Sequence, residues 1–189
     1  QAHCQSVGAL LIFDEIQCGM GRTGKMFAFE HYDVIPDILV LAKGLGGGMP
    51  IGAFISSYEN MQVFTEQPIL GHITTFGGHP VNCAAAMACI DTIQSENLIA
   101  KVAEKEEIIK SMMRHQKIIG ISGKGMMWAI EFKDFDENKR IIDRCIQMGV
   151  ITDWFLFAPH KLRIAPPLTI TNDELINALQ VVLDCIDAD

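Results

Sequence analysis

Three short, almost wholly apolar runs in the first third of the chain predict the strands of one sheet. They cover residues 9–13, 37–42 and 52–56, and none alternates between apolar and polar positions as a half-exposed strand does. Runs of this kind are typical of buried parallel strands that are covered on both faces. Loops and a candidate helix over 25–32 separate them, so we expect an α/β sheet with helices on its faces.

The spacing of the apolar positions changes from residue 79 on. Small and apolar residues dominate the stretch from 79 to the early nineties, which predicts a long buried helix. Ser95 with Glu96 is a plausible N-terminal cap for a second helix, whose apolar and charged positions over 98–115 fall largely on different faces. We expect the charged face of that helix to be solvated.

The part of the chain beyond residue 120 reads as a separate α+β unit. Short apolar or alternating stretches at 125–132, 150–152, 155–157 and 162–166 predict strands, and residues 137–148 and 172–186 predict helices. Thr171 is the expected N-cap of the last helix, with Glu174 completing a capping box. We therefore predict an α/β fold with two domains, a first domain with the α/β sheet over residues 1–95 and a C-terminal α+β domain over residues 96–189.

Composition narrows the class of protein. The chain has 189 residues, 49% of them hydrophobic, and a net charge of −8 without a basic cluster, which argues against nucleic-acid binding. Its longest apolar run, residues 83–90, is far shorter than the roughly 20 residues of a membrane span. The six cysteines form no CxxC or CxxH pair, so we expect no metal site and interpret them as free thiols in a reducing cytoplasm.

Two charged residues follow the first two predicted strands directly. Asp14 closes the first and Lys43 closes the second, ahead of a glycine-rich loop. Ligands of open α/β sheets bind at the carboxyl ends of strands. A structural ion pair is one interpretation, but a buried pair adds little stability. Pyridoxal 5′-phosphate (PLP) needs both an amine for an imine and a carboxylate for its ring nitrogen. A P-loop does not fit, because its lysine follows the glycines and precedes Ser or Thr.

Four blocks carry a resemblance to a known family. They are "LLIFDEIQCGMGRTG" (10–24), "PDILVLAKGLGGGMPIGA" (36–53), "HITTFGGHP" (72–80) and "LRIAPPL" (162–168). In this order the blocks resemble the landmarks of class III aminotransferases. These are PLP-dependent enzymes of fold type I that include the ornithine, acetylornithine, 4-aminobutyrate and lysine ε-aminotransferases.

The resemblance implies a role for each of five residues. Lys43 is implied to hold PLP covalently as a Schiff base and to move the proton at the substrate carbon. Asp14 is implied to bond the pyridine nitrogen, and Gln17 the ring 3-hydroxyl. Thr75 is implied to reach the phosphate in the partner subunit of a homodimer with shared active sites. Arg163 is implied to bind a substrate carboxylate, a bidentate task that suits a guanidinium group.

Other candidates near these blocks stay open at this point. We expect Glu15 to point away from Asp14 and to support the site from behind. Trp154, Phe155 and Phe157 precede Arg163 and could line a substrate pocket or belong to the core of the small domain.

The function that the resemblance implies is transfer of an amino group, possibly an ω-amino group, from an amino acid to a 2-oxo acid. The alternatives are another PLP-dependent reaction (mutase, racemase or decarboxylase) and a non-catalytic fragment. The chain does not begin with Met and opens on what reads as the tail of a helix. We therefore expect it to start within a fold. The resemblance implies a longer protein, of whose large domain residues 1–95 are an incomplete part and residues 96–189 the small domain. It also implies that the phosphate cradle of the family is missing here and that the chain is inactive alone.

Overall fold

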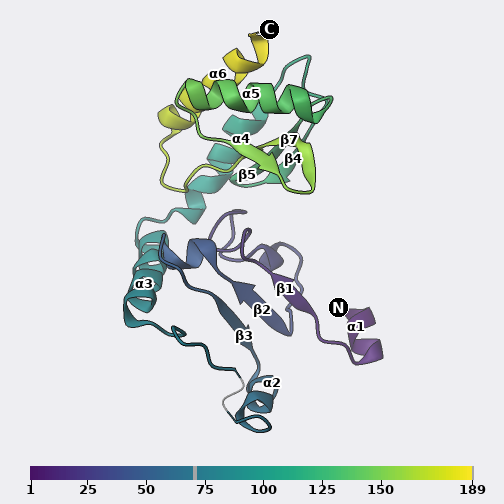
Figure 1. The fold of residues 1–189 in the computed structure, drawn as a ribbon, viewed down its shortest axis with the longest axis vertical. Helices are drawn as coiled ribbons and strands as arrows, with labels where there is room; N and C mark the ends of the chain where they lie inside the picture. Colours follow the sequence, from purple (N-terminus) through teal and green to yellow (C-terminus); the bar gives the residue numbers. More distant parts are fainter. Residues whose placement is uncertain (70–71, 189) are drawn as a thin grey trace. The chain divides into compact units, whose positions relative to one another are not determined.

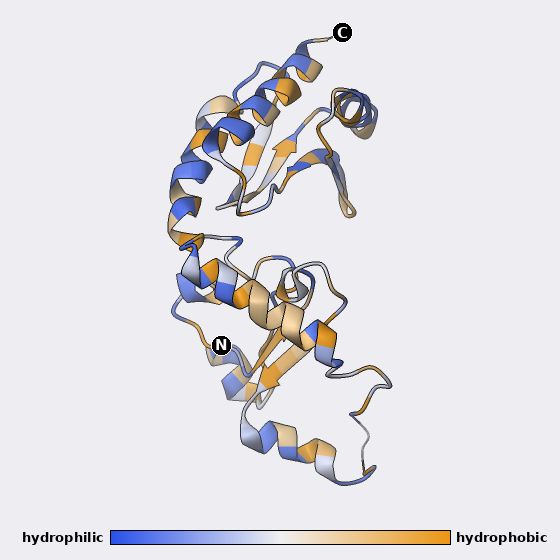
Figure 2. Cartoon of the chain, turned by 90° about the vertical axis from the view of Figure 1, so that its left-hand side faces the viewer, coloured by the Kyte–Doolittle hydropathy of each residue, from blue (hydrophilic) through white to orange (hydrophobic). Residues whose placement is uncertain are grey.

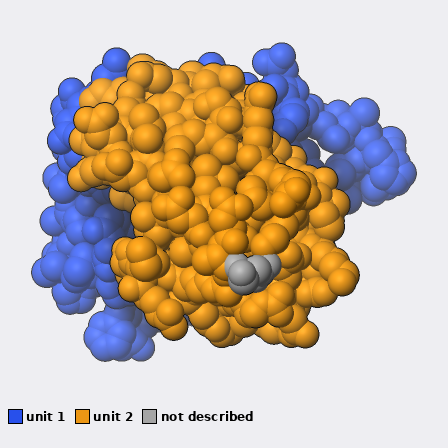
Figure 3. All heavy atoms as spheres, turned by 90° about the horizontal axis from the view of Figure 1, so that it is seen from above, with its two compact units in different colours: residues 1–97 blue, residues 98–189 orange. Residues whose placement is uncertain are grey.

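The computed structural model describes residues 1–69 and 72–188, which form two compact units. The division falls between Gln1–Asn97 and Leu98–Asp189 (Figure 3). Each unit has its own sheet, and no helix within the described residues is long and apolar enough to cross a membrane.

The first unit is built around a three-stranded sheet in the order β1-β2-β3 (Figure 1). β1 (Ile12–Asp14) runs parallel to β2 (Ile38–Leu41), which pairs antiparallel with β3 (Ala53–Ser56). The helical elements are α1 (Ala2–Val7), η1 (Ala28–His31), η2 (Lys43–Gly46), α2 (Tyr58–Gln62), η3 (Val63–Thr65) and α3 (Pro80–Ser95). The three predicted strands are confirmed, and the helix predicted over 25–32 is a single 3₁₀ turn.

The strands and α3 are less covered than the sequence predicts. Ile12 in β1 is 56% exposed, and only Ala86 and Ile93 of α3 are buried. The prediction that both faces of the sheet and the whole helix are buried is therefore wrong for the described chain. The reason is that α3 packs mainly on η2, the turn after β2, so the apolar strands keep open faces.

The second unit is an antiparallel sheet in the order β4-β5-β7-β6, covered by helices (Figure 1). Its strands are β4 (Gly120–Lys124), β5 (Met127–Glu131), β6 (Asp153–Phe155) and β7 (Ala158–Ile164). Its helices are η4 (Ile99–Lys101), α4 (Val102–Met112), α5 (Phe135–Gln147) and α6 (Asn172–Asp187). The predicted α+β organisation of this part is confirmed, but two of its strands differ from the prediction. β4 precedes the first predicted stretch, and residues 150–152 form no strand, because β6 begins only at Asp153.

Strand alternation decides which side chains of the second unit are buried. Along β5 and β7, Trp128, Ile130, Leu162 and Ile164 are buried, while the residues between them are half-exposed. Figure 2 shows both hydrophobic and hydrophilic residues on α6, the helix that ends at the C-terminus, and its buried residues recur every three to four positions. Buried side chains of the helices complete the core, among them Ile109, Ile142, Leu175, Leu179 and Val182.

The two predicted helix caps have different outcomes. The Thr171 hydroxyl accepts a hydrogen bond from the Glu174 N–H at 3.2 Å, and the Glu174 carboxylate accepts one from the Thr171 N–H at 2.9 Å. This capping box is confirmed. The Ser95 cap is wrong, because Ser95 is the last residue of α3 and the next helical turn begins at Ile99.

Candidate active site

The carboxyl ends of β1 and β2 bring two charged residues to one edge of the sheet. The strands are parallel, Asp14 pairs with Val40, and the Glu15 N–H donates to the Val40 carbonyl at 2.9 Å. Lys43 follows β2 after a single linking residue, Ala42. Both side chains therefore leave the sheet at the end where ligands of open α/β folds bind.

Only one of the two oxygens of the Asp14 carboxylate has a hydrogen-bond partner among the described residues. Its Oδ1 accepts a hydrogen bond from the Ile16 N–H at 3.0 Å, which shapes the turn after β1. Its side chain is exposed, and within residues 1–69 and 72–188 no donor contacts Oδ2. Gln17 lies in the same turn, is exposed, and has no hydrogen-bonding partner for its amide among the described residues. The turn therefore presents a carboxylate oxygen and an amide group that are free to bind a ligand.

Lys43 stands in an unusual backbone conformation. Its φ is +44°, in the left-handed region that costs a non-glycine residue about 1–2 kcal/mol. The side chain is exposed, and its amine has no ion-pair or hydrogen-bond partner in the described part of the chain. Strain of this kind persists only where the surrounding structure imposes it, and it often marks functional positions.

The loop after Lys43 is held against α3. The Cys89 thiol donates to the Gly44 carbonyl at 3.1 Å, and the Asn82 amide donates to the Pro50 carbonyl at 2.6 Å. Gly47 has a φ of +55°, and a Cβ at this position would lie 3.2 Å from the Cβ of Cys89. Glycine is therefore required here for the close approach of the loop to α3.

Glu15 organises the segment on the other side of the site. Its side chain is 3% exposed, and its two oxygens accept hydrogen bonds from the backbone N–H groups of Ala28 at 2.6 Å and Phe29 at 2.7 Å. Glu15 thus ties the strand end to the start of η1 and closes the loop that contains Gln17. Burial, together with the Glu15 carboxylate, raises the pKa of the nearby Cys18 thiol.

The sequence predicted a supporting role for Glu15 but not this one. An acidic doublet after a strand, Asp14 and Glu15, was the available signal, and alternation places the second carboxylate on the opposite side from the first. The groups that it binds, two N–H donors at the start of a short helix, could not be located from the sequence.

Thr75 lies in an exposed turn of the same unit. The turn is closed by the Gly77 N–H, which donates to the Thr74 carbonyl at 3.2 Å. The Thr75 side chain therefore faces solvent in the single chain, and its role toward a partner subunit stays a prediction.

Arg163 belongs to the second unit, on β7. It lies opposite Asp153 of β6, and its Nη2 contacts Asp153 Oδ2 at 2.6 Å. The Thr152 hydroxyl donates to the Arg163 carbonyl at 2.6 Å, which ties the two strands together. Asp153 Oδ1 is buried and has no hydrogen-bond partner within the described residues.

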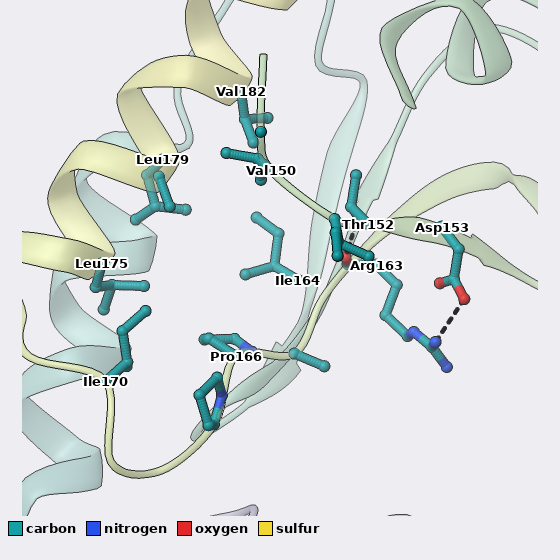
Figure 4. A pocket seen from close by; sticks show the side chains of 15 residues that line it. Val150, Thr152, Asp153, Arg163, Ile164, Pro166, Ile170, Leu175, Leu179 and Val182 are labelled. Atoms are coloured by element: carbon teal, nitrogen blue, oxygen red, sulfur yellow. Dashed lines mark hydrogen bonds and ion pairs between the residues drawn. The ribbon is translucent and has the colours of Figure 1, made fainter. Parts of the chain in front are cut away.

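A cavity of about 500 Å³ lies beside this strand pair, within the second unit. Figure 4 shows Val150 and Ile164 facing apolar side chains of α6 across it. The contributions of α6 are Leu175, Ala178, Leu179 and Val182. The Arg163 and Asp153 side chains border the cavity, but their paired ends point away from these apolar groups (Figure 4).

None of the three aromatic residues before Arg163 lines the cavity or belongs to the buried core. Phe157 is 96% exposed, so it is not part of the core. Trp154 packs edge-to-face on Phe135 of α5, with ring centroids 5.5 Å apart, and is half-exposed. Phe155 is half-buried.

The structure thus brings three of the five predicted residues to one place. Asp14, Gln17 and Lys43 meet at the carboxyl edge of the first sheet, and each keeps a polar group that no described residue binds. A carboxylate, an amide and a primary amine fit PLP, whose ring nitrogen, ring hydroxyl and aldehyde they can bind.

Known proteins are similar to this chain over nearly its whole length. A family model for class III aminotransferases matches residues 1–186. Putrescine aminotransferase of Pectobacterium atrosepticum is 42% identical over 193 residues, which cover 98% of this chain and 41% of that protein. The chain therefore spans less than half of the length of this curated relative.

Solved structures share the fold over the whole chain. An aminotransferase of Bacillus anthracis superposes with a TM-score of 0.90 at 32% identity, covering 100% of this chain and 47% of that one. Ornithine aminotransferase of Toxoplasma gondii, a structure with PLP at partial occupancy in its active site, gives 0.86 at 31% identity, covering 98% and 44%. Acetylornithine aminotransferase of Elizabethkingia anophelis gives 0.86 at 33% identity, covering 98% and 47%. The mixed α/β fold and the matched family together show that the chain belongs to the PLP-dependent class III aminotransferases.

Proposed function

We propose that the protein containing this chain is a PLP-dependent aminotransferase that moves an amino group from an amine or amino acid to a 2-oxo acid. The observation that carries the proposal is that Asp14 and Lys43 lie at the ends of two parallel strands. Among the described residues, neither the Lys43 amine nor Asp14 Oδ2 has a hydrogen-bond partner. We also propose that residues 1–95 belong to its PLP-binding domain and residues 96–189 to its small domain.

Each residue at this edge of the sheet has a separate role in the proposal. PLP, when bound, supplies an aldehyde that links to amines and a ring that withdraws electrons from the substrate carbon. Lys43 holds the cofactor through its amine and later moves a proton at the substrate carbon that carries the amino group. Asp14 keeps a proton on the ring nitrogen with its carboxylate, and Gln17 donates to the ring hydroxyl.

Arg163 binds a carboxylate of the substrate in this proposal. A guanidinium group suits a carboxylate because its N–H donors match the two oxygens. The similarity to putrescine and ornithine aminotransferases supports a donor with a primary amine at the end of its carbon chain.

Thr75 serves the partner subunit of a homodimer in this proposal. Its exposed hydroxyl, in a turn without regular secondary structure, supports a role outside its own chain. In the full-length protein, mixing Lys43→Ala with Thr75→Ala subunits tests this idea. A mixed dimer would hold one intact site and recover activity, whereas no recovery would contradict a shared site.

Reduction with borohydride tests the central assignment. In the full-length protein incubated with PLP, the reduced cofactor should be found by peptide mapping on Lys43. Label on another residue would refute the assignment. Equal amounts of amino acid consumed and new amino acid formed from a 2-oxo acid separate transamination from a mutase, racemase or decarboxylase reaction.

We also propose that the 189-residue chain alone binds PLP weakly and shows no turnover. The support is that it covers only 41% of the length of the putrescine aminotransferase to which it is similar. An aldimine-like absorbance band with turnover in the purified chain would overturn it.

We place the protein in the cytoplasm. The support is a pair of buried thiols, Cys145 and Cys185, which lie within hydrogen-bonding reach of each other and are free. Fluorescence microscopy of the tagged full-length protein tests this location, and an extracytoplasmic signal would contradict it.

A further inference from the structure

The partner of Arg163 sits directly opposite it on the neighbouring strand. Asp153 and Arg163 form a register pair between β6 and β7, and the Nη2–Oδ2 distance is 2.6 Å. On the other side Arg163 pairs with Ala129 of β5, which carries no charge. Among the described residues, Asp153 is the only acid in contact with the guanidinium group.

Stability does not account for this ion pair. The two side chains are 36% and 47% exposed, and pairs exposed to this degree contribute little to folding. The second carboxylate oxygen, Asp153 Oδ1, is buried without a partner, which is destabilising. Asp153 therefore lowers stability, although it lies beside the arginine that is proposed to bind the substrate. An effect of Asp153 on the substrate explains its presence more simply than an effect on folding.

The effect follows from charge. Arg163 paired with Asp153 has a local net charge near zero, although most of its N–H donors remain available. A substrate carboxylate bound to those donors would lie roughly 5 Å from the Asp153 carboxylate and be repelled, which weakens binding about fourfold at a dielectric constant near that of water. A substrate end that carries an ammonium group would instead be attracted.

We propose that Asp153 is a specificity-determining residue, which weakens binding of substrate ends that carry a carboxylate and favours cationic ends such as those of diamines. The proposal rests on the proposed function, in which Arg163 contacts the substrate. It adds the class of donor that the pair of residues favours.

An Asp153→Asn variant of the full-length, PLP-loaded protein tests the proposal. Asparagine keeps the shape and one acceptor for Arg163 but removes the charge. We expect KM for 2-oxoglutarate to fall about fourfold and KM for putrescine to rise about threefold or more, with kcat changed less than twofold for both. A thermal melt like that of the wild type shows that the variant is folded.

Glu131→Gln is the matched control. Glu131 lies on β5, two residues along from Ala129, and its carboxylate pairs with Lys161 at 2.9 Å rather than with Arg163. The substitution removes the same charge from the same face of the sheet, so both KM values should stay at the wild-type level.

Three outcomes would overturn the proposal. A rise in KM for 2-oxoglutarate in Asp153→Asn would mean that Asp153 only orients Arg163. Unchanged KM values, or equal changes in the Glu131→Gln control, would show that the charge of Asp153 does not reach the substrate.

Arg163→Gln distinguishes a failure of the proposal for Asp153 from a failure of the proposed role of Arg163. If it raises KM for 2-oxoglutarate while Asp153→Asn lowers nothing, the proposal for Asp153 alone fails. If it changes nothing, the carboxylate role of Arg163 fails, and the proposal for Asp153 with it.

Discussion

Glu15 gives the clearest test of which interactions hold the segment after Asp14 in place. Its buried carboxylate accepts hydrogen bonds from the N–H groups of Ala28 and Phe29 at 2.6 and 2.7 Å. A hydrogen bond to a charged group is worth about 1.5–3 kcal/mol, and a buried donor left without a partner costs a similar amount. Glu15→Ala should therefore lower the free energy of unfolding by about 3–5 kcal/mol. Glu15→Gln, which keeps one acceptor, should lower it by about 1.5–3 kcal/mol.

Two measurements on the full-length protein check this prediction. Urea unfolding followed by far-UV circular dichroism gives the free energy, and hydrogen exchange of a peptide spanning 25–32 shows where protection is lost. The control is Glu30→Gln in the same segment, whose exposed carboxylate accepts from the Phe27 N–H at 2.7 Å and should cost no more than about 1 kcal/mol. If Glu15→Ala matches this control, or exchange in 25–32 is unchanged, then Glu15 does not hold the segment.

Three further predictions concern the second unit in the full-length protein. Thr171→Ala removes the cap of α6 and should lower the free energy of unfolding in urea by about 1 kcal/mol. Thr169→Ala, at an exposed position that caps no helix, should leave this free energy unchanged. Equal effects of the two substitutions would contradict the cap. Burial alone would raise the pKa of Glu106, but hydrogen bonds, chiefly from Lys110, lower it overall. Stability from Glu106 is then present above about pH 4.5 and lost as pH falls below it, and Glu106→Gln should flatten this part of the pH–stability curve; an unchanged slope would contradict it. Burial raises the pKa of Cys145 to about 12, so maleimide at pH 7.5 should label Cys145 only after unfolding, and rapid labelling of the native protein would contradict its burial.

Local patterns in the sequence were enough to predict most elements of the fold. The apolar runs located β1, β2 and β3, and the Thr171 capping box located the start of α6, because each depends on residues close in sequence. The cap predicted at Ser95 was wrong because Ser and Glu occur at the end of a helix as well as at its start. Which of the two forms here depends on where α3 stops packing. The exposure of α3 could not be predicted either, since burial depends on what lies against a helix.

The candidate site divides in the same way. Asp14 and Lys43 could be placed together because parallel strands end at one edge, which is a rule of topology. The Asp153–Arg163 pair could not, because it depends on the register of β6 against β7, and a bulge between Trp154 and Phe155 shifts that register. One residue of slip turns every side chain of a strand to the other face, so spacing along the chain did not reveal the contact.

The residues that hold the site are not the residues that are proposed to bind the cofactor. Lys43 remains at a φ of +44° although this conformation costs about 1–2 kcal/mol, so its surroundings must supply more than that. The hydrogen bonds from Cys89 and Asn82 fix the loop after Lys43 on α3, and the two bonds to Glu15 fix the segment after Asp14. Each set anchors one side of the edge without engaging the free amine or the free carboxylate oxygen. The amine and the carboxylate are therefore positioned by hydrogen bonds between other side chains and the neighbouring backbone, and no described residue engages the amine or Oδ2 of the carboxylate.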